Sequence, residues 1–339
     1  MSRFRYILKR LLLMIPVVIF GTSVTFIILY AGPIDPATVI LGQTATPAQR
    51  AALRAQLGLN QPLWGQYIDF LVNMLTLDLG QSWVIQPETG AYEVILNFLP
   101  RTVWMGLWAV TLPIFVGIPL GFYAGMNPNT FRDYFASFGG IVWRSMPRFW
   151  LAVILMVGLS RSEAILFGFN WTGFIVESNV VGPPPLNNLT DPHSLLVAIK
   201  MVLPAAIVLG NSSMGNEMRV GRTAFLEVKN SNYVEMARAK GVPGRSIVWK
   251  HIFRNALMPL VPLITAEAVL IIAGSVLIET VFGINGIGWL FFQSMIQGDI
   301  PLAGALMFFF IIIIVGMNLV QDILYTIIDP RVSMEEANP

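Results

Sequence analysis

The sequence predicts an all-α polytopic membrane protein with six transmembrane helices and both termini in the cytoplasm. Composition is the first observation, because 55% of the 339 residues are hydrophobic and only 12% are charged, about half the charged fraction that is usual in soluble proteins. The second observation is a series of apolar runs near the ~20 residues that a bilayer-spanning helix requires. The third is an uneven distribution of basic residues, which predicts the orientation.

The N-terminal segment predicts the first span. Four basic residues precede an uncharged run from Leu11 to Ala31, and no A-x-A cleavage site follows it. Because this run is long enough to cross a bilayer, we predict an uncleaved helix rather than a removed signal peptide. Residues 1–31 would then comprise a cytoplasmic N-terminus and the first transmembrane helix.

The segment 32–100 is too polar to span a membrane and is predicted to be an extracytoplasmic loop with short helices. Thr46 followed three residues later by Gln49 is a capping-box pattern, and the helix that it opens would end near Gly58. Apolar residues from Trp64 to Leu75 recur at helical spacing. This spacing predicts a second helix, which lies on the protein or on the membrane surface.

Residues 101–328 form the predicted transmembrane core, and 329–339 a cytoplasmic tail. The core spans are expected at Thr102–Met126, within Phe135–Phe169, and at Leu195–Met218, Ala256–Phe282 and Leu302–Ile328. The third span is irregular because it contains Arg144 and Arg148, one helical turn apart on one face. Either both arginines extend to the cytoplasmic interface, or they face a polar pathway.

The orientation follows from the basic residues. The predicted inner side holds 16 of them, or 14 without Arg144 and Arg148, whereas the outer side holds only Arg50, Arg54, Arg101 and Arg161. The segment from Arg219 to Arg254 alone contains 8 basic and 2 acidic residues. Both termini and this segment are therefore expected in the cytoplasm.

The basic segment has the pattern of a helical hairpin at 219–255. Asn232 and Glu235 suggest a capping box that opens a helix from Tyr233 to Lys240. Gly241 can adopt the left-handed conformation that ends such a helix, and Pro243 prevents its continuation. A second helix is expected from about Arg245 to Asn255.

The hairpin has two interpretations. It could be a solvated loop that only sets the topology, as most basic loops do. An ordered helix with apolar residues beside its charges instead favours docking in the groove of a partner. The apolar residues in question are Tyr233, Val234, Met236 and Ala237.

The hairpin and the flanking chain carry a family resemblance. Glu235-Met236-Ala237, Gly241 and Asn255-Ala256-Leu257-Met258-Pro259 resemble the EAA motif of binding-protein-dependent ABC importer permeases, with methionine in place of the first alanine of the motif. Further matches to the dipeptide, oligopeptide and nickel branch extend over nearly the whole chain, as in Gly58–Trp64, Asp78-Leu79-Gly80, Gly117–Gly121, Glu279–Phe282 with Gly286-Ile287-Gly288, and Asn318 to Arg331.

The resemblance implies a type I ABC importer permease fold in a cell membrane and a coupling helix that docks on an ATP-binding subunit. The coupling residues would be Tyr233, Glu235, Met236, Ala237, Arg238, Ala239, Lys240, Gly241 and Pro259. The expected partners are a homologous permease, two ATP-binding subunits, an extracytoplasmic substrate-binding protein and membrane lipid, with no nucleic acid. The cargo of this branch is a peptide, an oligosaccharide or nickel.

The sequence lacks several kinds of chemistry. It has no phosphate-binding G-x-x-x-x-G-K-[ST] loop, so ATP and Mg²⁺ are expected in separate subunits. It has no cysteine, and His193 and His251 lie far apart, so we expect no metal site, no cofactor and no enzymatic activity in this chain. An intramembrane enzyme would need a catalytic set that is not seen. The alternative of an ion-coupled secondary transporter would need inverted repeats, and none is evident.

Charged residues inside the spans indicate where a pathway could run, because they usually face protein or water. The candidates are Glu267, Lys200, Arg144, Arg148 and Glu279. Glu267, near the middle of the fifth span, could line the pathway and favour a cationic or hydrogen-bonding cargo. Alternatively it is protonated, or pairs with Lys200 or an arginine of the third span. Glu279 is expected at a gate or in a structural contact, since nearby glycines allow a tight re-entrant turn.

Overall fold

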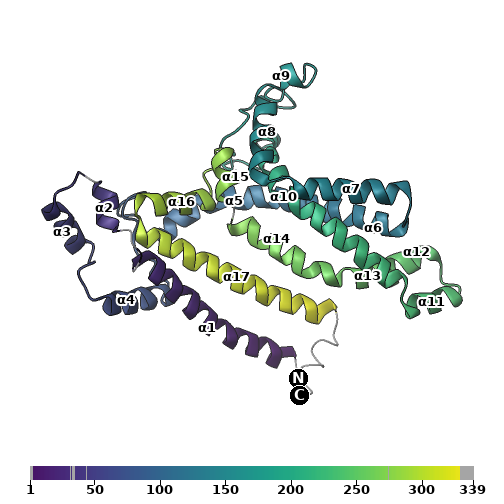
Figure 1. The fold of residues 1–339 in the computed structure, drawn as a ribbon, viewed down its shortest axis with the longest axis horizontal. Helices are drawn as coiled ribbons and strands as arrows, with labels where there is room; N and C mark the ends of the chain where they lie inside the picture. Colours follow the sequence, from purple (N-terminus) through teal and green to yellow (C-terminus); the bar gives the residue numbers. More distant parts are fainter. Residues whose placement is uncertain (1–2, 31, 33–34, 43, 274, 329–339) are drawn as a thin grey trace.

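The computed structural model describes residues 3–30, 32, 35–42, 44–273 and 275–328, and it shows an elongated array of helices (Figure 1). Within those residues there is no strand, and a single isolated bridge joins Gln81 to Gly90. The predicted all-α class is therefore confirmed. The predicted tail, 329–339, lies outside the described residues.

The helices follow the chain in a simple order. The N-terminal part contains α1 (Arg3–Tyr30), α2 (Pro36–Leu41), α3 (Pro47–Gln56), α4 (Leu63–Leu75), α5 (Ala91–Leu112), the π-helix η1 (Pro113–Gly117), α6 (Ile118–Met126), α7 (Phe131–Ser145), α8 (Arg148–Ser160) and α9 (Ser162–Ile165). The C-terminal part contains α10 (Pro192–Lys229), α11 (Asn232–Ala239), α12 (Gly244–Ser246), the π-helix η2 (Ile247–Ile252), α13 (Phe253–Ala256), the 3₁₀-helix η3 (Met258–Leu260), α14 (Val261–Ala273), α15 (Val276–Val281), α16 (Ile287–Gln297) and α17 (Ile300–Ile328).

Four helical segments among the described residues are long and apolar enough to cross a membrane. They are Ile7–Tyr30, Ala91–Met126, Pro192–Lys229 and Ile300–Leu324, and they coincide with the predicted first, second, fourth and sixth spans. The predicted fifth span is instead divided between α14 and α15. Because α14 has 13 residues, it is about 20 Å long and shorter than the ~30 Å hydrocarbon layer.

The predicted third span is also broken. Helices α7 and α8 meet at an angle of 95°, because Pro147 follows Met146 and holds that residue in an extended conformation with ψ of 122°. Arg144 ends up on α7 and Arg148 on α8. The prediction that the two arginines lie one turn apart on one helical face is therefore wrong.

Helix α10 is the central element, and glycines bring its neighbours close to its backbone. A Cβ atom at Gly210 would lie 2.2 Å from the carbonyl oxygen of Ala109 in α5, and one at Gly121 of α6 would lie 2.3 Å from that of Met218. Small residues at such contacts are typical of packed membrane helices. Helices α5, α6 and α10 therefore pack backbone to backbone.

The segment 32–100, which is predicted to lie outside the membrane and is called the outer segment below, packs on the first helix. Thr46 and Gln49 form the predicted capping box at the start of α3, and α4 matches the predicted helix at Trp64–Leu75 closely. Helix α4 lies against α1, where Phe70 contacts Phe26 with 5.7 Å between ring centroids. The Ser23 hydroxyl is 2.8 Å from the Tyr67 hydroxyl. This helix is therefore part of the folded protein.

Asp299 fastens the outer segment to the start of α17. Its buried carboxylate accepts hydrogen bonds from the Ser82 hydroxyl at 2.5 Å and from the backbone N–H groups of Trp83, Val84 and Ile85 at 2.9–3.1 Å. A buried carboxylate that satisfies three backbone donors of a partly buried turn fixes that turn firmly. The sequence pattern did not indicate this contact, because its partners are more than 200 residues apart.

Candidate functional site

The predicted coupling helix exists, but it begins one residue before the predicted position. Ser231 is the N-cap, with φ of −78° and ψ of 147°, and Asn232 is the first helical residue of α11. The Ser231 hydroxyl donates to the Val228 carbonyl at 2.6 Å and does not cap α11. The predicted capping box between Asn232 and Glu235 is therefore wrong, because Asn232 already has helical geometry.

The end of α11 agrees with the prediction. Gly241 adopts a left-handed conformation with φ of +74°. The N–H of Gly241 donates to the Arg238 carbonyl at 2.9 Å, and the N–H of Val242 donates to the Ala237 carbonyl at 3.1 Å. This pattern is the usual glycine termination of a helix. It turns the chain back toward α10.

The second arm of the hairpin is helical from Gly244 to Ala256, close to the predicted range, with the wider turn of η2 at its centre. The Asn255 side chain links the two arms, because its amide donates to the Tyr233 hydroxyl at 2.9 Å and to the His251 carbonyl at 3.0 Å. Pro259 is an exposed residue of η3, between this arm and α14. Movement of α11 must therefore involve the second arm.

Helix α11 has an inner face and an outer face. Val234 and Ala237 are buried in an apolar cluster formed with residues of α6, α10, the second arm and η3, namely Ile118, Phe122, Ala224, Phe225, Ile247, Ile252, Ala256 and Leu260. Tyr233 is 43% exposed and Met236 56% exposed. Glu235, Arg238, Ala239 and Lys240 are also exposed. Ala237 thus anchors the helix from within, and Tyr233 and Met236 form its apolar outer surface.

A run of aromatic rings extends from the hairpin into the helical bundle. Trp249 contacts Phe253 with ring centroids 5.3 Å apart, Phe253 contacts Phe122 of α6 at 5.3 Å, and Phe122 contacts Phe225 of α10 at 5.7 Å. Trp249 is exposed. The sequence analysis did not single out these residues, although a tryptophan among the charges of the predicted second arm is a usable signal.

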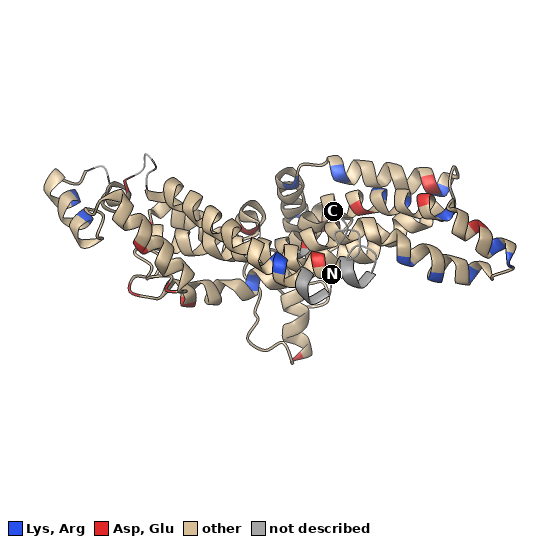
Figure 2. Cartoon of the chain, turned by 90° about the horizontal axis from the view of Figure 1, so that it is seen from below, with Lys and Arg blue, Asp and Glu red and all other residues tan. Residues whose placement is uncertain are grey.

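Basic side chains gather around this hairpin. Figure 2 shows most lysines and arginines toward the end of the molecule that α10 to α13 form. Helix α11 itself contributes Arg238, and Lys240 follows it as the C-cap. The positive charge and the exposed apolar surface therefore lie at the same end.

Two of the pathway candidates, Lys200 and Glu279, make contacts that hold parts of the fold together. The buried Lys200 ammonium donates to the carbonyl oxygens of Thr172, at 2.8 Å, and of Val176, and it lies over the Trp171 ring. It therefore holds the loop between α9 and α10 and forms no hydrogen bond or salt bridge with Glu267. Sequence reasoning had considered that pairing.

Glu279 is also fully buried. Its carboxyl oxygens accept from the Thr102 hydroxyl at 2.9 Å and from the Trp289 N–H at 2.7 Å. The Thr102 hydroxyl oxygen in turn accepts from the Ile287 N–H at 2.7 Å. These contacts fasten the turn between α15 and α16 to α5, so Glu279 occupies a structural contact.

The other candidates are divided between two places. Arg148 donates to the Ser212 hydroxyl from Nε at 2.9 Å and from Nη2 at 2.5 Å. Glu267 of α14 interacts with Ser213 and with the charge of Arg148. Arg148 and Glu267 therefore belong to one polar group between α8, α10 and α14, whereas Arg144 borders a separate cavity next to α10.

Glu217 also belongs to this polar group, although the sequence analysis did not single it out. Its side chain is 1% exposed, and neither carboxyl oxygen has a hydrogen-bond partner. It lies close enough to Glu267 for their charges to interact. An unpartnered carboxyl group in a buried position is costly unless it is neutral.

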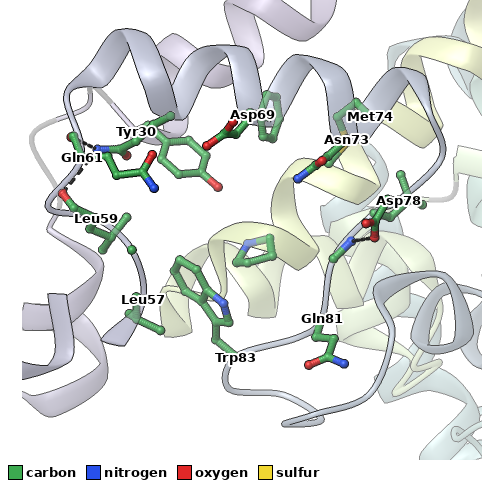
Figure 3. Close-up of a pocket in the computed structure, with 16 residues that line it drawn as sticks. Tyr30, Leu57, Leu59, Gln61, Asp69, Asn73, Met74, Asp78, Gln81 and Trp83 are labelled. Atoms are coloured by element: carbon green, nitrogen blue, oxygen red, sulfur yellow. Dashed lines mark hydrogen bonds between the residues drawn. The ribbon is translucent and has the colours of Figure 1, made fainter. Parts of the chain in front are cut away.

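A second cavity, of about 280 Å³, opens in the outer segment. Figure 3 shows Asp69, Asn73 and Asp78 on one side of it and Leu57 and Trp83 on another. The Gln66 amide donates to the Leu59 and Gln61 carbonyls at 3.3 and 2.7 Å and holds the rim. The cavity thus combines carboxylates and amides with apolar walls. No group of three or more residues that could hold a metal ion is found in the described part of the chain.

These features define a multi-pass membrane protein with a structured, basic hairpin beside a polar interior. Residues 117–334 match the family model of the binding-protein-dependent transport system inner membrane component, and residues 3–104 match the model of its N-terminal region. The chain belongs to this family. It is therefore a multi-pass protein of the plasma membrane, and the resemblance seen in its motifs is confirmed.

Relatives match over nearly the whole chain. The oligopeptide transport system permease protein AppB of Bacillus subtilis is 33% identical over 96% of this chain and 98% of the relative. The dipeptide transport system permease protein DppB of Escherichia coli is 29% identical over 97% and 98%. A solved inward-facing structure of the MetNI methionine ABC transporter is 17% identical with a TM-score of 0.46, over 69% of this chain and 96% of that chain. Family membership favours the binding-protein-dependent class over an ion-coupled secondary transporter.

Proposed function

We propose that the chain is the membrane-spanning permease subunit of an ATP-driven importer of peptide-like solutes, and that the outer face of α11 docks on an ATP-binding subunit. The observation that supports docking most directly is the division of α11 into two faces. Val234 and Ala237 hold the helix in place, while Tyr233 and Met236 remain exposed. Apolar side chains on an ordered, exposed helix are the usual anchors of a helix in a groove.

The proposed assembly contains a homologous permease, two ATP-binding subunits that hold ATP and Mg²⁺, and an external substrate-binding protein. In this proposal the residues that hydrolyse ATP belong to the ATP-binding subunits. Its regions are a first span at 1–31, an outer segment at 32–100 and a core at 101–328 with the coupling hairpin at 219–255. Four continuous spans and the broken pair α7–α8 make five among the described residues. We propose that α14 and α15 form the sixth, with cytoplasmic termini, in accord with the distribution of basic residues.

The contacts suggest how ATP closure would reach the pathway. A force on α11 acts directly on the second arm through the bond between Tyr233 and Asn255. The second arm acts on α6 and α10 through the aromatic contacts of Phe253 and Phe122. The polar group at Glu267 and Arg148 lies between α10 and the neighbouring helices. We therefore place the translocation pathway beside this group.

The outer cavity fits the delivery of cargo by the binding protein. Its exposed Asp69 and Asp78 carboxylates and its amides offer partners for polar groups of a protein surface or of a peptide. It is formed by the outer segment, by Tyr30 at the end of α1 and by Pro301 at the start of α17. Docking there would act on α17 directly, because Trp83 lines the cavity and its turn is held by Asp299, just before α17.

The docking proposal predicts the effect of Met236→Glu. A carboxylate at the centre of the apolar outer face would be desolvated in the groove of the partner, so we expect about a tenfold or greater loss of affinity for the ATP-binding subunit. Co-purification of the two subunits and ATP-dependent peptide uptake in proteoliposomes measure this loss. Membrane insertion should not change, since Met236 is exposed.

Met126→Glu is the matched control. Met126 ends α6 at the same end of the molecule and is exposed, but it is not part of α11. This variant should retain the ATP-binding subunit. Equal losses in both variants, or full retention in Met236→Glu, would contradict docking through α11.

The pathway proposal predicts the effect of Glu267→Gln. Removing the negative charge beside Arg148 should lower uptake of cationic peptides relative to neutral peptides by about fivefold or more, the effect of about 1 kcal/mol. Competition uptake with matched lysine-containing and glutamine-containing peptides measures the ratio. Glu227→Gln makes the same change at an exposed position of α10 and should leave the ratio unchanged. An unchanged ratio in Glu267→Gln would remove Glu267 from the pathway.

A further inference from the structure

A cavity of about 500 Å³ lies between α7 and α10. Three arginines line it, Arg144 from α7 and Arg219 and Arg222 from α10, together with the hydroxyl groups of Ser137 and Thr223. The cavity takes no part in the docking surface of α11. Its lining presents hydrogen-bond donors and positive charge, which is the chemistry that recognises a phosphate group.

The positive charge of the cavity is only partly neutralised. Arg222 forms two hydrogen bonds to the buried carboxylate of Asp133, from Nε at 2.5 Å and from Nη2 at 2.7 Å. In the described part of the chain neither Arg144 nor Arg219 forms a salt bridge, and Arg219 donates only a 3.4 Å hydrogen bond to the Asn216 amide oxygen. Two guanidinium groups are therefore available to an anion, next to a third that Asp133 holds rigidly.

The position of the cavity along α10 fits the depth of lipid headgroups. Helix α10 has no charged residue from Met201 to Asn216, a stretch of about 24 Å at 1.5 Å per residue. Glu217 ends this stretch, Arg219 and Arg222 follow within the next two turns, and α10 continues to Lys229 beyond them. Basic pockets between helices at this level are suited to anionic headgroups.

The surface next to the cavity is apolar. Phe135, Phe138 and Ile141 of α7 are all exposed, and Ile141 also lines the cavity. The inner side of the cavity is closed where α7 touches α10, since a Cβ atom at Gly215 would lie 2.5 Å from the Gly140 carbonyl oxygen. A headgroup in the cavity would thus have its acyl chains against α7.

We propose that this cavity binds the phosphate of an anionic phospholipid, with Arg144 and Arg219 as the main ligands and Arg222 as a fixed neighbour. A second copy of the chain is less suited to the site, because it would bring the same unpaired arginines to it. The proposal does not depend on the transported solute. It also gives Arg144 a role that differs from that of Arg148.

Lipid binding to the full chain, purified in neutral detergent, tests the proposal. Native mass spectrometry with added phosphatidylglycerol, phosphatidylcholine or inorganic phosphate gives a Kd for each probe. Of the three probes, we expect only phosphatidylglycerol to be retained tightly. We expect its Kd to rise about 25-fold in the double variant Arg144→Gln/Arg219→Gln, as about fivefold per basic residue implies. The Arg222–Asp133 pair stays intact, so the fold should be retained.

Two variants serve as controls. Arg132→Gln removes an exposed arginine of α7 that does not line the cavity, so the Kd of this variant for phosphatidylglycerol should not change. Arg144→Lys/Arg219→Lys keeps the charge and should restore most of the affinity. Equal retention of phosphatidylglycerol in the wild type and the glutamine variant overturns the proposal. So does inorganic phosphate that binds as tightly as the lipid, or a change of oligomeric state without a change in lipid retention.

Discussion

The substitution Gly286→Ala is expected to destabilise the protein by about 3–5 kcal/mol, because it combines overpacking with the loss of buried hydrogen bonds. A Cβ atom there would lie 2.1 Å from the Thr102 hydroxyl oxygen and 2.9 Å from the Glu279 carboxyl carbon. Neither can move without breaking the bonds from Thr102 to Glu279 and from Ile287 to Thr102. The turn between α15 and α16 would then separate from α5.

The thermal midpoint and the yield of folded protein in detergent measure this effect. Gly158→Ala is the matched control, because α8 offers open space around that position. Alanine in place of a helical glycine is expected to be neutral or to stabilise by about 0.5–1 kcal/mol. A midpoint for Gly286→Ala equal to that of the control would show that the contact at Thr102 is not needed for the fold.

The substitution Gly241→Val is expected to leave the rate of ATP hydrolysis unchanged and to lower peptide uptake about tenfold or more. A β-branched residue at φ of +74° costs about 2–3 kcal/mol, more than the ~1.4 kcal/mol that changes a population tenfold. The native stop after α11 would then be a minor conformation. The outer face of α11 would no longer have a fixed orientation relative to the second arm.

The measurement is the ratio of ATP hydrolysed to peptide accumulated in proteoliposomes that contain the complete transporter. Gly244→Ala is the control, since Gly244 lies three residues further on, has open space around it and does not adopt a positive φ. Its ratio should equal that of the wild type. An unchanged ratio for Gly241→Val would argue against coupling through this helix.

The elements that sequence reasoning located correctly depend on local signals. Helix α17 follows from an uninterrupted apolar run, and α3 follows from Thr46 and Gln49, three residues apart. The end of α11 follows from Gly241, because only glycine adopts the left-handed conformation at little cost. Each of these signals lies within a few residues of the structure that it specifies.

Features that depend on distant contacts could not be predicted in this way. The bend at Pro147 was not anticipated, because a proline inside an apolar run is also compatible with a kinked but continuous span. No sequence pattern indicated the contacts of Asp299 and Glu217. Asp299 meets the turn at Ser82–Ile85, and Glu217 lies near Glu267, only after the chain has folded. Lys200 was considered as a partner for Glu267, but backbone carbonyls of the outer loop hold it instead.

The uninterrupted length of α10 has a mechanical consequence. Its 38 residues extend about 57 Å, from the loop that Lys200 holds at one end to the chain reversal before α11 at the other. If this helix moves as a stiff rod about a fulcrum near its middle, a tilt of a few degrees at the hairpin moves the opposite end, about 28 Å away, by about 2 Å. The two surfaces of the membrane would be joined by one lever, whose fulcrum lies where Gly210 and Gly121 bring α5 and α6 against its backbone.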